Sequence, residues 1–226
     1  MSTIKIVVLA SLAAPVATCV CAQGAVVGFH ESFAQDAANW RGASSATTLG
    51  WSSLGGPGDA AYVTSIYNLV NTQAGGIPAT IIRAATSAGS SGGAYQGNWA
   101  IEGVTGVSFW FRHDLSQSIS LSLRIASPQN YPGASAFDGV LIPASTWTLV
   151  EFDLRETGGE WVSFEGTTYT TALSNVANMQ IGFAVPASLA GQNINGLFDM
   201  TGFSIVPAPG ALALLTMGAL LTRRRR

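Results

Sequence analysis

The segment Ser118–Ala126 reads SISLSLRIA, and its side chains alternate between polar and apolar from Ser118 to Ile125. A strict period of two predicts a β-strand with one buried face and one face in water. The buried face would hold Ile119, Leu121, Leu123 and Ile125, and the wet face would hold Ser118, Ser120, Ser122 and Arg124. The preceding stretch Thr105–His113 predicts a partner strand, and the short link Asp114–Gln117 predicts a hairpin between the two.

Strand patterns of this kind recur along the rest of the chain. We expect further strands at Val26–Phe33, Ala60–Tyr67, Thr80–Ala84, Thr146–Leu154, Met179–Val185 and Leu197–Val206. A short helix is predicted at Thr170–Ala177. Trp110 and Trp147 lie inside strand patterns, so we assign both to the core. Many short antiparallel strands between residues 23 and 205 predict a single all-β domain that forms a two-sheet sandwich.

The composition of residues 23–205 excludes several classes of protein. Of the 226 residues of the chain, 10% are charged, and this region holds all twelve acidic residues but five arginines, which gives it a formal net charge of −7. A surface of that sign repels phosphate backbones, so nucleic-acid binding is not expected. Both cysteines, Cys19 and Cys21, precede the region, which excludes disulfides and thiol catalysis within it.

The N-terminus has the pattern of a secretory signal peptide. Lys5 precedes an apolar stretch from Ile6 to Val20, and small residues follow at Cys21 and Ala22. A basic start, an apolar core and a small-residue site are what signal peptidase cleaves. We therefore expect residues 1–22 to be a signal helix that is removed after Ala22. The alternative is a lipoprotein acylated at Cys19 or Cys21.

The C-terminus combines a proline motif, an apolar stretch and a basic end. Val206-Pro207-Ala208-Pro209-Gly210 is followed by apolar residues from Ala211 to Leu221, and the chain ends in Arg223, Arg224, Arg225 and Arg226. An eleven-residue helix rises about 16 Å, whereas the hydrocarbon core of a bilayer is about 30 Å thick. The segment is therefore short for a permanent membrane span, and its arginines would stay cytoplasmic.

This order of features resembles the PEP-CTERM sorting signal, which a membrane-embedded exosortase reads and cleaves. The resemblance covers residues 206–226 and departs from the usual motif at Ala208, where the family carries Glu. It implies a short C-terminal hydrophobic helix that holds the chain transiently in the inner membrane before processing. The alternative is a plain C-terminal anchor that is kept, with its arginines reaching the interface.

Several short motifs between residues 23 and 205 resemble jelly-roll carbohydrate-binding modules of the galactose-binding-like fold. They are Glu31-Ser32-Phe33 with Trp40, Trp51 with Gly55-Gly56 and Tyr62, the stretch Trp147–Leu154, and Phe198-Asp199. The resemblance implies an antiparallel two-sheet jelly roll at residues 23–205. It also implies a structural calcium ion, with Glu31 and Asp199 as oxygen ligands that tie the first strand to the last.

Sugar recognition needs flat aromatic faces next to hydrogen-bonding groups, because the C–H faces of a sugar stack while its hydroxyls need polar partners. Aromatic residues with Gly, Asn or Gln neighbours in loops are the candidates. We predict Trp51, Tyr95 and Trp99 as the glycan-binding residues, with Tyr62 and Tyr131 as further candidates.

Catalytic patterns are weak. His30 and His113 are far apart in the sequence and have no neighbouring nucleophile motif. His113 ends a predicted strand, where we expect a solvated or a capping role. Glu151 and Asp153 share a strand face, but glycoside hydrolysis needs two carboxylates about 5–9.5 Å apart with different pKa values, and the sequence shows no such pair in a cleft.

We therefore predict a non-enzymatic, exosortase-processed protein of the bacterial cell surface or extracellular matrix. Its role would be structural or adhesive, and it would bind a glycan such as an exopolysaccharide. The alternative is a secreted glycan-active hydrolase.

Overall fold

The computed structural model describes residues 28–137, 140–155, 161–163 and 165–208. The predicted signal peptide and the predicted sorting signal from Pro209 onward, with Arg223–Arg226, lie outside these residues. Within the described part of the chain, no helix is both long enough and apolar enough to cross a membrane.

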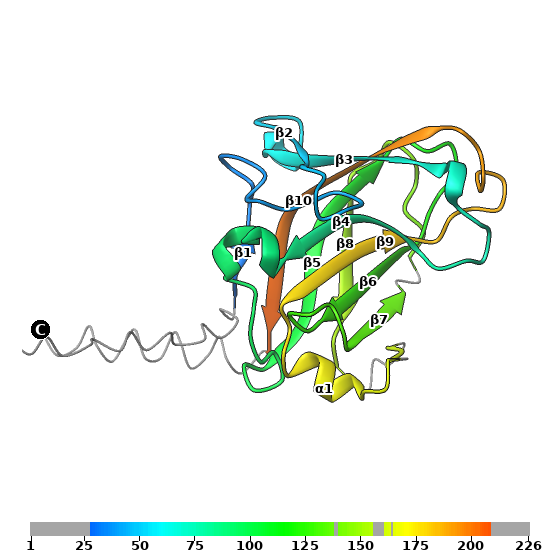
Figure 1. The fold of residues 1–226 in the computed structure, drawn as a ribbon. Helices are drawn as coiled ribbons and strands as arrows, with labels where there is room; N and C mark the ends of the chain where they lie inside the picture. The colour runs from blue at the N-terminus through cyan, green and yellow to red at the C-terminus, as the bar shows by residue number, and fades with distance from the viewer. Residues whose placement is uncertain (1–27, 138–139, 156–160, 164, 209–226) are drawn as a thin grey trace, which may run out of the picture.

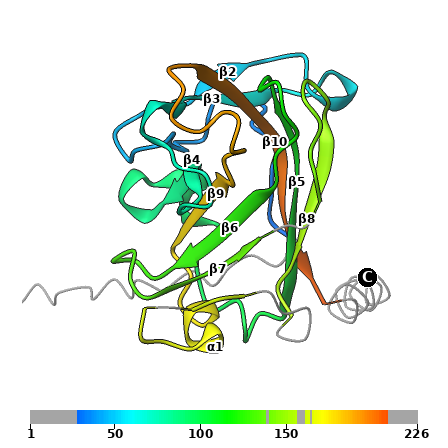
Figure 2. The same ribbon diagram turned by 90° about the vertical axis from the view of Figure 1, so that its right-hand side faces the viewer.

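The described chain forms two antiparallel sheets that pack face to face (Figures 1 and 2). Sheet A has the order β2-β3-β10-β5-β8, with β1 paired to β10. Its strands are β1 (His30–Glu31), β2 (Gly50–Ser52), β3 (Tyr62–Asn68), β5 (Val104–His113), β8 (Thr148–Asp153) and β10 (Asn195–Pro207). Sheet B has the order β4-β9-β6-β7. Its strands are β4 (Ala79–Ala85), β6 (Leu121–Ala126), β7 (Gly133–Phe137) and β9 (Asn178–Phe183). The all-β, antiparallel two-sheet jelly-roll sandwich predicted from the sequence is confirmed.

Helical structure is limited to short turns. The α-helix α1 (Tyr169–Leu173) falls within one residue of the predicted helix start, and the side chain of Thr168 caps it by accepting from Thr171 N. Single turns of 3₁₀-helix lie at Pro57–Asp59, Leu69–Asn71, Thr86–Ala88 and Ser90–Gly93. The hydroxyl at the N-cap satisfies one of the amides that a helix start leaves unpaired.

The predicted hairpin between Thr105–His113 and Ser118–Ala126 is wrong. The first segment forms β5 in sheet A, between β10 and β8, whereas the second forms β6 in sheet B, between β9 and β7. The link between them crosses from one layer to the other, and both Leu115 and Ile119 are buried there. A four-residue spacing fits a hairpin or a crossing between layers equally well, and burial of these two apolar side chains favours the crossing.

Alternating residues of both sheets build the core. Leu121, Leu123 and Ile125 face inward as predicted, and Phe109 stacks between Phe152 and Phe203 at centroid distances of 6.2 and 6.1 Å. Each buried side chain of this size contributes about 1.5–3 kcal/mol. The described residues contain no cysteine, so this packing must hold the two sheets together.

Trp110 and Trp147 are not core residues, contrary to the prediction. In β5, Phe109 and Phe111 point between the sheets and are fully buried, so Trp110 between them must point to the opposite face. Trp147 precedes β8 and is only partly buried. Both therefore lie on the outward face of sheet A.

The last strand runs past the predicted domain boundary. β10 includes Val206 and Pro207, and the Thr105 hydroxyl donates to both of their carbonyl oxygens, at 3.3 and 3.1 Å. Ala208 N donates to Gly103 O at 2.8 Å. The first three residues of the proline motif are thus hydrogen-bonded to the end of the sandwich.

Candidate functional site

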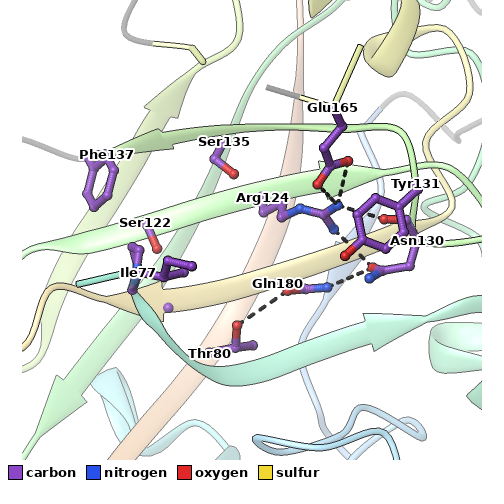
Figure 3. Close-up of a pocket in the computed structure, with 12 residues that line it drawn as sticks. Ile77, Thr80, Ser122, Arg124, Asn130, Tyr131, Ser135, Phe137, Glu165 and Gln180 are labelled. Carbon is purple, nitrogen blue, oxygen red and sulfur yellow. Dashed lines mark hydrogen bonds and ion pairs between the residues drawn. The ribbon is translucent and has the colours of Figure 1, made fainter. Parts of the chain in front are cut away.

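The outward face of sheet B carries a hollow of about 280 Å³, which we call the sheet-B groove (Figure 3). Its floor consists of outward-facing residues of all four strands, and its rim is formed by the segments before β4 and after β6. The described residues that line it are Ile77, Pro78, Thr80, Ser122, Arg124, Asn130, Tyr131, Ser135, Phe137, Glu165, Gln180 and Gly182.

A polar network runs along the floor of the groove, as the dashed lines in Figure 3 show. Arg124 of β6 donates to both carboxylate oxygens of Glu165, at 2.8 and 3.0 Å, and to Asn130 Oδ1 at 3.0 Å. Gln180 of β9 donates to the same Asn130 oxygen at 2.8 Å, and Thr80 of β4 donates to Gln180 Oε1 at 3.4 Å. The network fixes these side chains before any ligand arrives, which lowers the entropy cost of binding.

Aromatic side chains rise from the rim of the groove. Tyr131 is 64% exposed, and its ring lies 5.5 Å from the guanidinium carbon of Arg124. Phe137, at the end of β7, is 45% exposed. The short loop that carries Tyr131 is held in place because Asn178 donates to Ser127 O at 2.6 Å and Ser127 N donates to Pro132 O at 3.0 Å. The ring of Tyr131 is therefore an exposed surface on a fixed backbone.

Two glycines keep the groove open. A Cβ at Gly182 would lie 2.9 Å from Ser122 Oγ and 3.0 Å from Ala79 O. A Cβ at Gly133 would lie 2.7 Å from Ile125 O and 2.8 Å from Arg124 Nη2. At these positions a larger side chain would displace either the backbone or the guanidinium that anchors the polar network.

The groove adjoins two further hollows, one on the same face and one at the β4 edge of the sheet, where Tyr67 of β3 also lines it. One, of about 240 Å³, shares Asn130 and Gln180 with the groove, and the other, of about 420 Å³, shares Thr80. Arg83 of β4 lines both of the additional hollows. Burial lowers the pKa of Arg83, and the nearby positive charge of Arg124 lowers it further. The arrangement offers an extended binding surface with aromatic walls and a polar floor.

Of the three aromatics predicted to bind a glycan, Tyr95 and Trp99 are buried. Both are 0% exposed, Tyr95 OH donates to Ala177 O at 3.0 Å, and Trp99 Nε1 donates to Tyr95 O at 2.7 Å. Burial also raises the pKa of the Tyr95 hydroxyl. A fully buried ring has no face for a sugar, so the prediction for these two residues is wrong. Glycine-rich neighbours mark their segment as a loop, but that loop packs into the core.

Trp51 is 42% exposed but does not line the groove. It pairs with the buried Val63 across β2 and β3, which places its side chain on the inward side of an edge strand, and its Nε1 donates to Phe33 O at 2.7 Å. Tyr62, a further candidate, lies on the outward face of sheet A. Only Tyr131 among the sequence candidates reaches the sheet-B groove.

Glu31 and Asp199, the predicted calcium ligands, do not share a site. Glu31 pairs with Phe203 on β10, four residues beyond Asp199, which corresponds to about 13 Å along a strand. Glu31 accepts from Phe33 N and Ser91 Oγ, at 2.9 and 2.8 Å. Asp199 accepts from Arg112 at 2.9 and 2.6 Å and from Thr64 Oγ1 at 2.7 Å. The described residues contain no group of three His, Cys, Asp or Glu side chains positioned for a metal ion.

The remaining candidates for chemistry lie away from the groove. His113 is buried rather than solvated: Nε2 lies 3.0 Å from Ile142 O, Nδ1 has no partner within the described chain, and burial lowers its pKa. Glu151 and Asp153 share the outward face of β8 as predicted. Asp153 is paired with Arg155 at 2.6 Å, and the hydrogen bonds from Arg155 lower the pKa of Asp153.

Sequence reasoning missed most of the groove. Ser122 and Arg124 could be placed on the outward face from the alternation of β6, and Gln180 lies in the predicted strand Met179–Val185, but Glu165 and Phe137 come from segments with no such signal. Their approach depends on strand pairing between distant segments, in which Arg124 lies opposite Gln180 on one side and Ser135 on the other. A single sequence does not specify that pairing.

No protein-family model and no curated protein matches the chain. Among solved structures, it is similar to the CBM22-1–GH10 modules of Clostridium thermocellum endo-1,4-β-D-xylanase 10B, complexed with xylohexaose, with 12% identity and a TM-score of 0.43 over 78% of this chain. The match covers 28% of that xylanase chain. A family 11 carbohydrate-binding module from the same organism, in complex with a β-1,3-1,4-mixed-linked tetrasaccharide, matches with 12% identity and a TM-score of 0.40, over 80% of this chain and 97% of that one. The L4b domain of human laminin α-2 matches with 8% identity and a TM-score of 0.37, over 58% of this chain and 72% of that one.

Proposed function

We propose that the sandwich domain binds a polysaccharide in the sheet-B groove. The observation that carries the proposal is the position of Tyr131, an exposed ring above a floor of fixed hydrogen-bonding groups. Sugars present C–H faces that stack on aromatic rings and hydroxyls that need donors and acceptors, and the groove supplies both. Its continuation into neighbouring hollows fits a chain of several sugar units rather than one.

Binding without hydrolysis is the second part of the proposal. Among the described residues that line the groove, Glu165 alone is acidic. Its carboxylate pairs with Arg124, and both side chains are 16% exposed. A hydrolase needs a protonated carboxylic acid and a second carboxylate at the scissile bond. Both carboxylate oxygens of Glu165 accept hydrogen bonds from Arg124 Nη2, at 2.8 and 3.0 Å, and no second carboxylate lines the groove among the described residues. We therefore assign Glu165 to positioning Arg124.

The biological setting is the third part. The signal peptide and sorting signal predicted from the two ends of the sequence would deliver the domain to the cell surface or extracellular matrix. There, a polysaccharide-binding domain would act in adhesion or matrix assembly. Mass spectrometry of the protein from its host reads both termini, and a chain that retains Met1 and Arg226 would contradict processing.

Affinity electrophoresis against a panel of soluble neutral and acidic polysaccharides tests the binding. We expect retardation by at least one polymer and about tenfold weaker binding for Tyr131→Ala, which corresponds to about 1.4 kcal/mol. Trp51→Ala, outside the groove, should bind like the wild type. Equal loss in both variants, or retardation by none of the polymers, would contradict the proposal. Release of reducing ends by the wild type that Glu151→Gln or Glu165→Gln abolishes would establish the hydrolase instead.

A further inference from the structure

Three arginines and a glutamine form one row across the outward face of sheet B. Arg41 pairs with Arg83, Arg83 pairs with Gln180, and Gln180 pairs with Arg124. Residues directly opposite one another on antiparallel strands point to the same face of the sheet. Strands lie about 4.8 Å apart, so the row extends for about 14 Å from Arg41 to Arg124. We call it the arginine row.

The row is only partly neutralised. Arg112, Arg124 and Arg155 each form an ion pair with a carboxylate at 2.6–2.8 Å. Arg41 and Arg83 have no carboxylate partner in the described part of the chain. The region has twelve acidic residues and five arginines, so a shortage of acidic residues does not explain two arginines without a carboxylate partner. The unpaired positive charge is concentrated beside the sheet-B groove.

Arg83 is held in one orientation with donors to spare. Its Nε and Nη2 both donate to Ala43 O, at 3.0 and 2.8 Å. A guanidinium has five N–H donors, so three remain for another acceptor. Arg83 also lines the two hollows that extend the groove. Next to it in the row, the Nε of Arg41 is buried and has no partner within the described residues.

We propose that the preferred ligand is an acidic polysaccharide whose carboxylates, as in uronic acid units, bind along the arginine row. This inference rests on the proposed polysaccharide binding. The planar fork of Arg83 matches a carboxylate in a bidentate arrangement, and its partial burial strengthens the attraction relative to water. Arg124 is already paired with Glu165, and through Asn130 it holds Gln180 of the row in place. Tyr131 stacks on the sugar ring. Neutral hydroxyls cannot neutralise the charges of Arg41 and Arg83, which have no carboxylate partner in the described chain, so neutral chains should bind more weakly.

Polygalacturonate and its methyl ester provide a matched pair of probes, because they share one backbone and differ only at the carboxyl group, which is charged in the acid and neutral in the ester. In calorimetric or electrophoretic titrations with the full domain, the acid should bind at least tenfold more tightly than the ester at low salt. The difference should shrink as ionic strength rises. Arg83→Gln should lose about tenfold in affinity for the acid and little for the ester.

Arg155→Gln is the control for net charge, since it removes one positive charge from an exposed arginine outside the row. We expect it to bind both polymers like the wild type. If Arg155→Gln and Arg83→Gln lose affinity equally, or if acid and ester bind equally, the arginine row is not the recognition element. If in that case only Tyr131→Ala loses affinity, the proposal of polysaccharide binding in the groove stands, and only the proposed preference for acidic chains is overturned. Absence of binding to every polymer would overturn both proposals.

Discussion

The outward faces of the two sheets use similar residues in opposite ways. On sheet A, Arg112 is held by Asp199 at 2.6 Å and lies over the ring of Trp147 at 4.6 Å and that of Tyr62 at 5.4 Å. The charge of Arg112 is thus paired with a carboxylate, and its guanidinium packs against two aromatic rings of the protein itself. On sheet B, Tyr131 is exposed and Arg83 has unused donors. The comparison shows that a binding surface depends on unfilled contacts more than on residue type.

The largest expected effect comes from breaking the closed cluster on sheet A. Asp199→Asn leaves Arg112 without its carboxylate, and Asp199 is largely buried, so we expect a loss of about 2–3 kcal/mol in the free energy of unfolding. Arg83→Gln on sheet B removes two hydrogen bonds to a single carbonyl oxygen and should cost less, about 1–2 kcal/mol. Urea denaturation measures both. Equal losses would mean that Arg83 is as essential to the fold as the Asp199 pair, and the contrast would fail.

A smaller effect is expected from two matched glycines, one on each outward face. Gly182→Ala places a Cβ within 3.0 Å of Ser122 Oγ and Ala79 O, which should destabilise the fold by about 1–2 kcal/mol through overpacking. Gly50 lies on β2 opposite Thr64, and a Cβ there would be 3.6 Å from its nearest neighbours. Gly50→Ala should therefore stay within about 0.5 kcal/mol of the wild type. Thermal melts compare the stability of the two variants. An unchanged melting temperature for Gly182→Ala would show that the neighbouring residues can move to accommodate the added methyl group.

The sequence was most informative where one face of a strand is wet. The alternation in β6 predicted its buried apolar residues and the outward position of Ser122 and Arg124, which form part of the floor of the groove. The predicted exposure to water is wrong for Ser122, which is 6% exposed. The same alternation could not tell the two faces of β5 apart, because Phe109, Trp110 and Phe111 are all aromatic. In the structure, the two phenylalanines are buried in the core, and the tryptophan lies on the outward face.

The sequence alone did not predict which distant segments lie next to one another in the fold. The assignment of β5 and β6 to different sheets, the approach of Glu165 to Arg124 and the separation of Glu31 from Asp199 all depend on which distant segments become neighbours. The loop signals around Tyr95 and Trp99 were equally ambiguous, because glycine and asparagine permit a tight path but do not determine whether the rings between them face water or the core.

The most direct test of the account is a titration of the ¹⁵N-labelled domain with oligogalacturonate, followed by amide chemical shifts. Polysaccharide binding in the groove predicts that the largest changes lie on sheet B, at Arg83, Arg124, Asn130 and Gln180. Changes concentrated instead on the outward face of sheet A, at Thr64, Arg112 and Trp147, would contradict it.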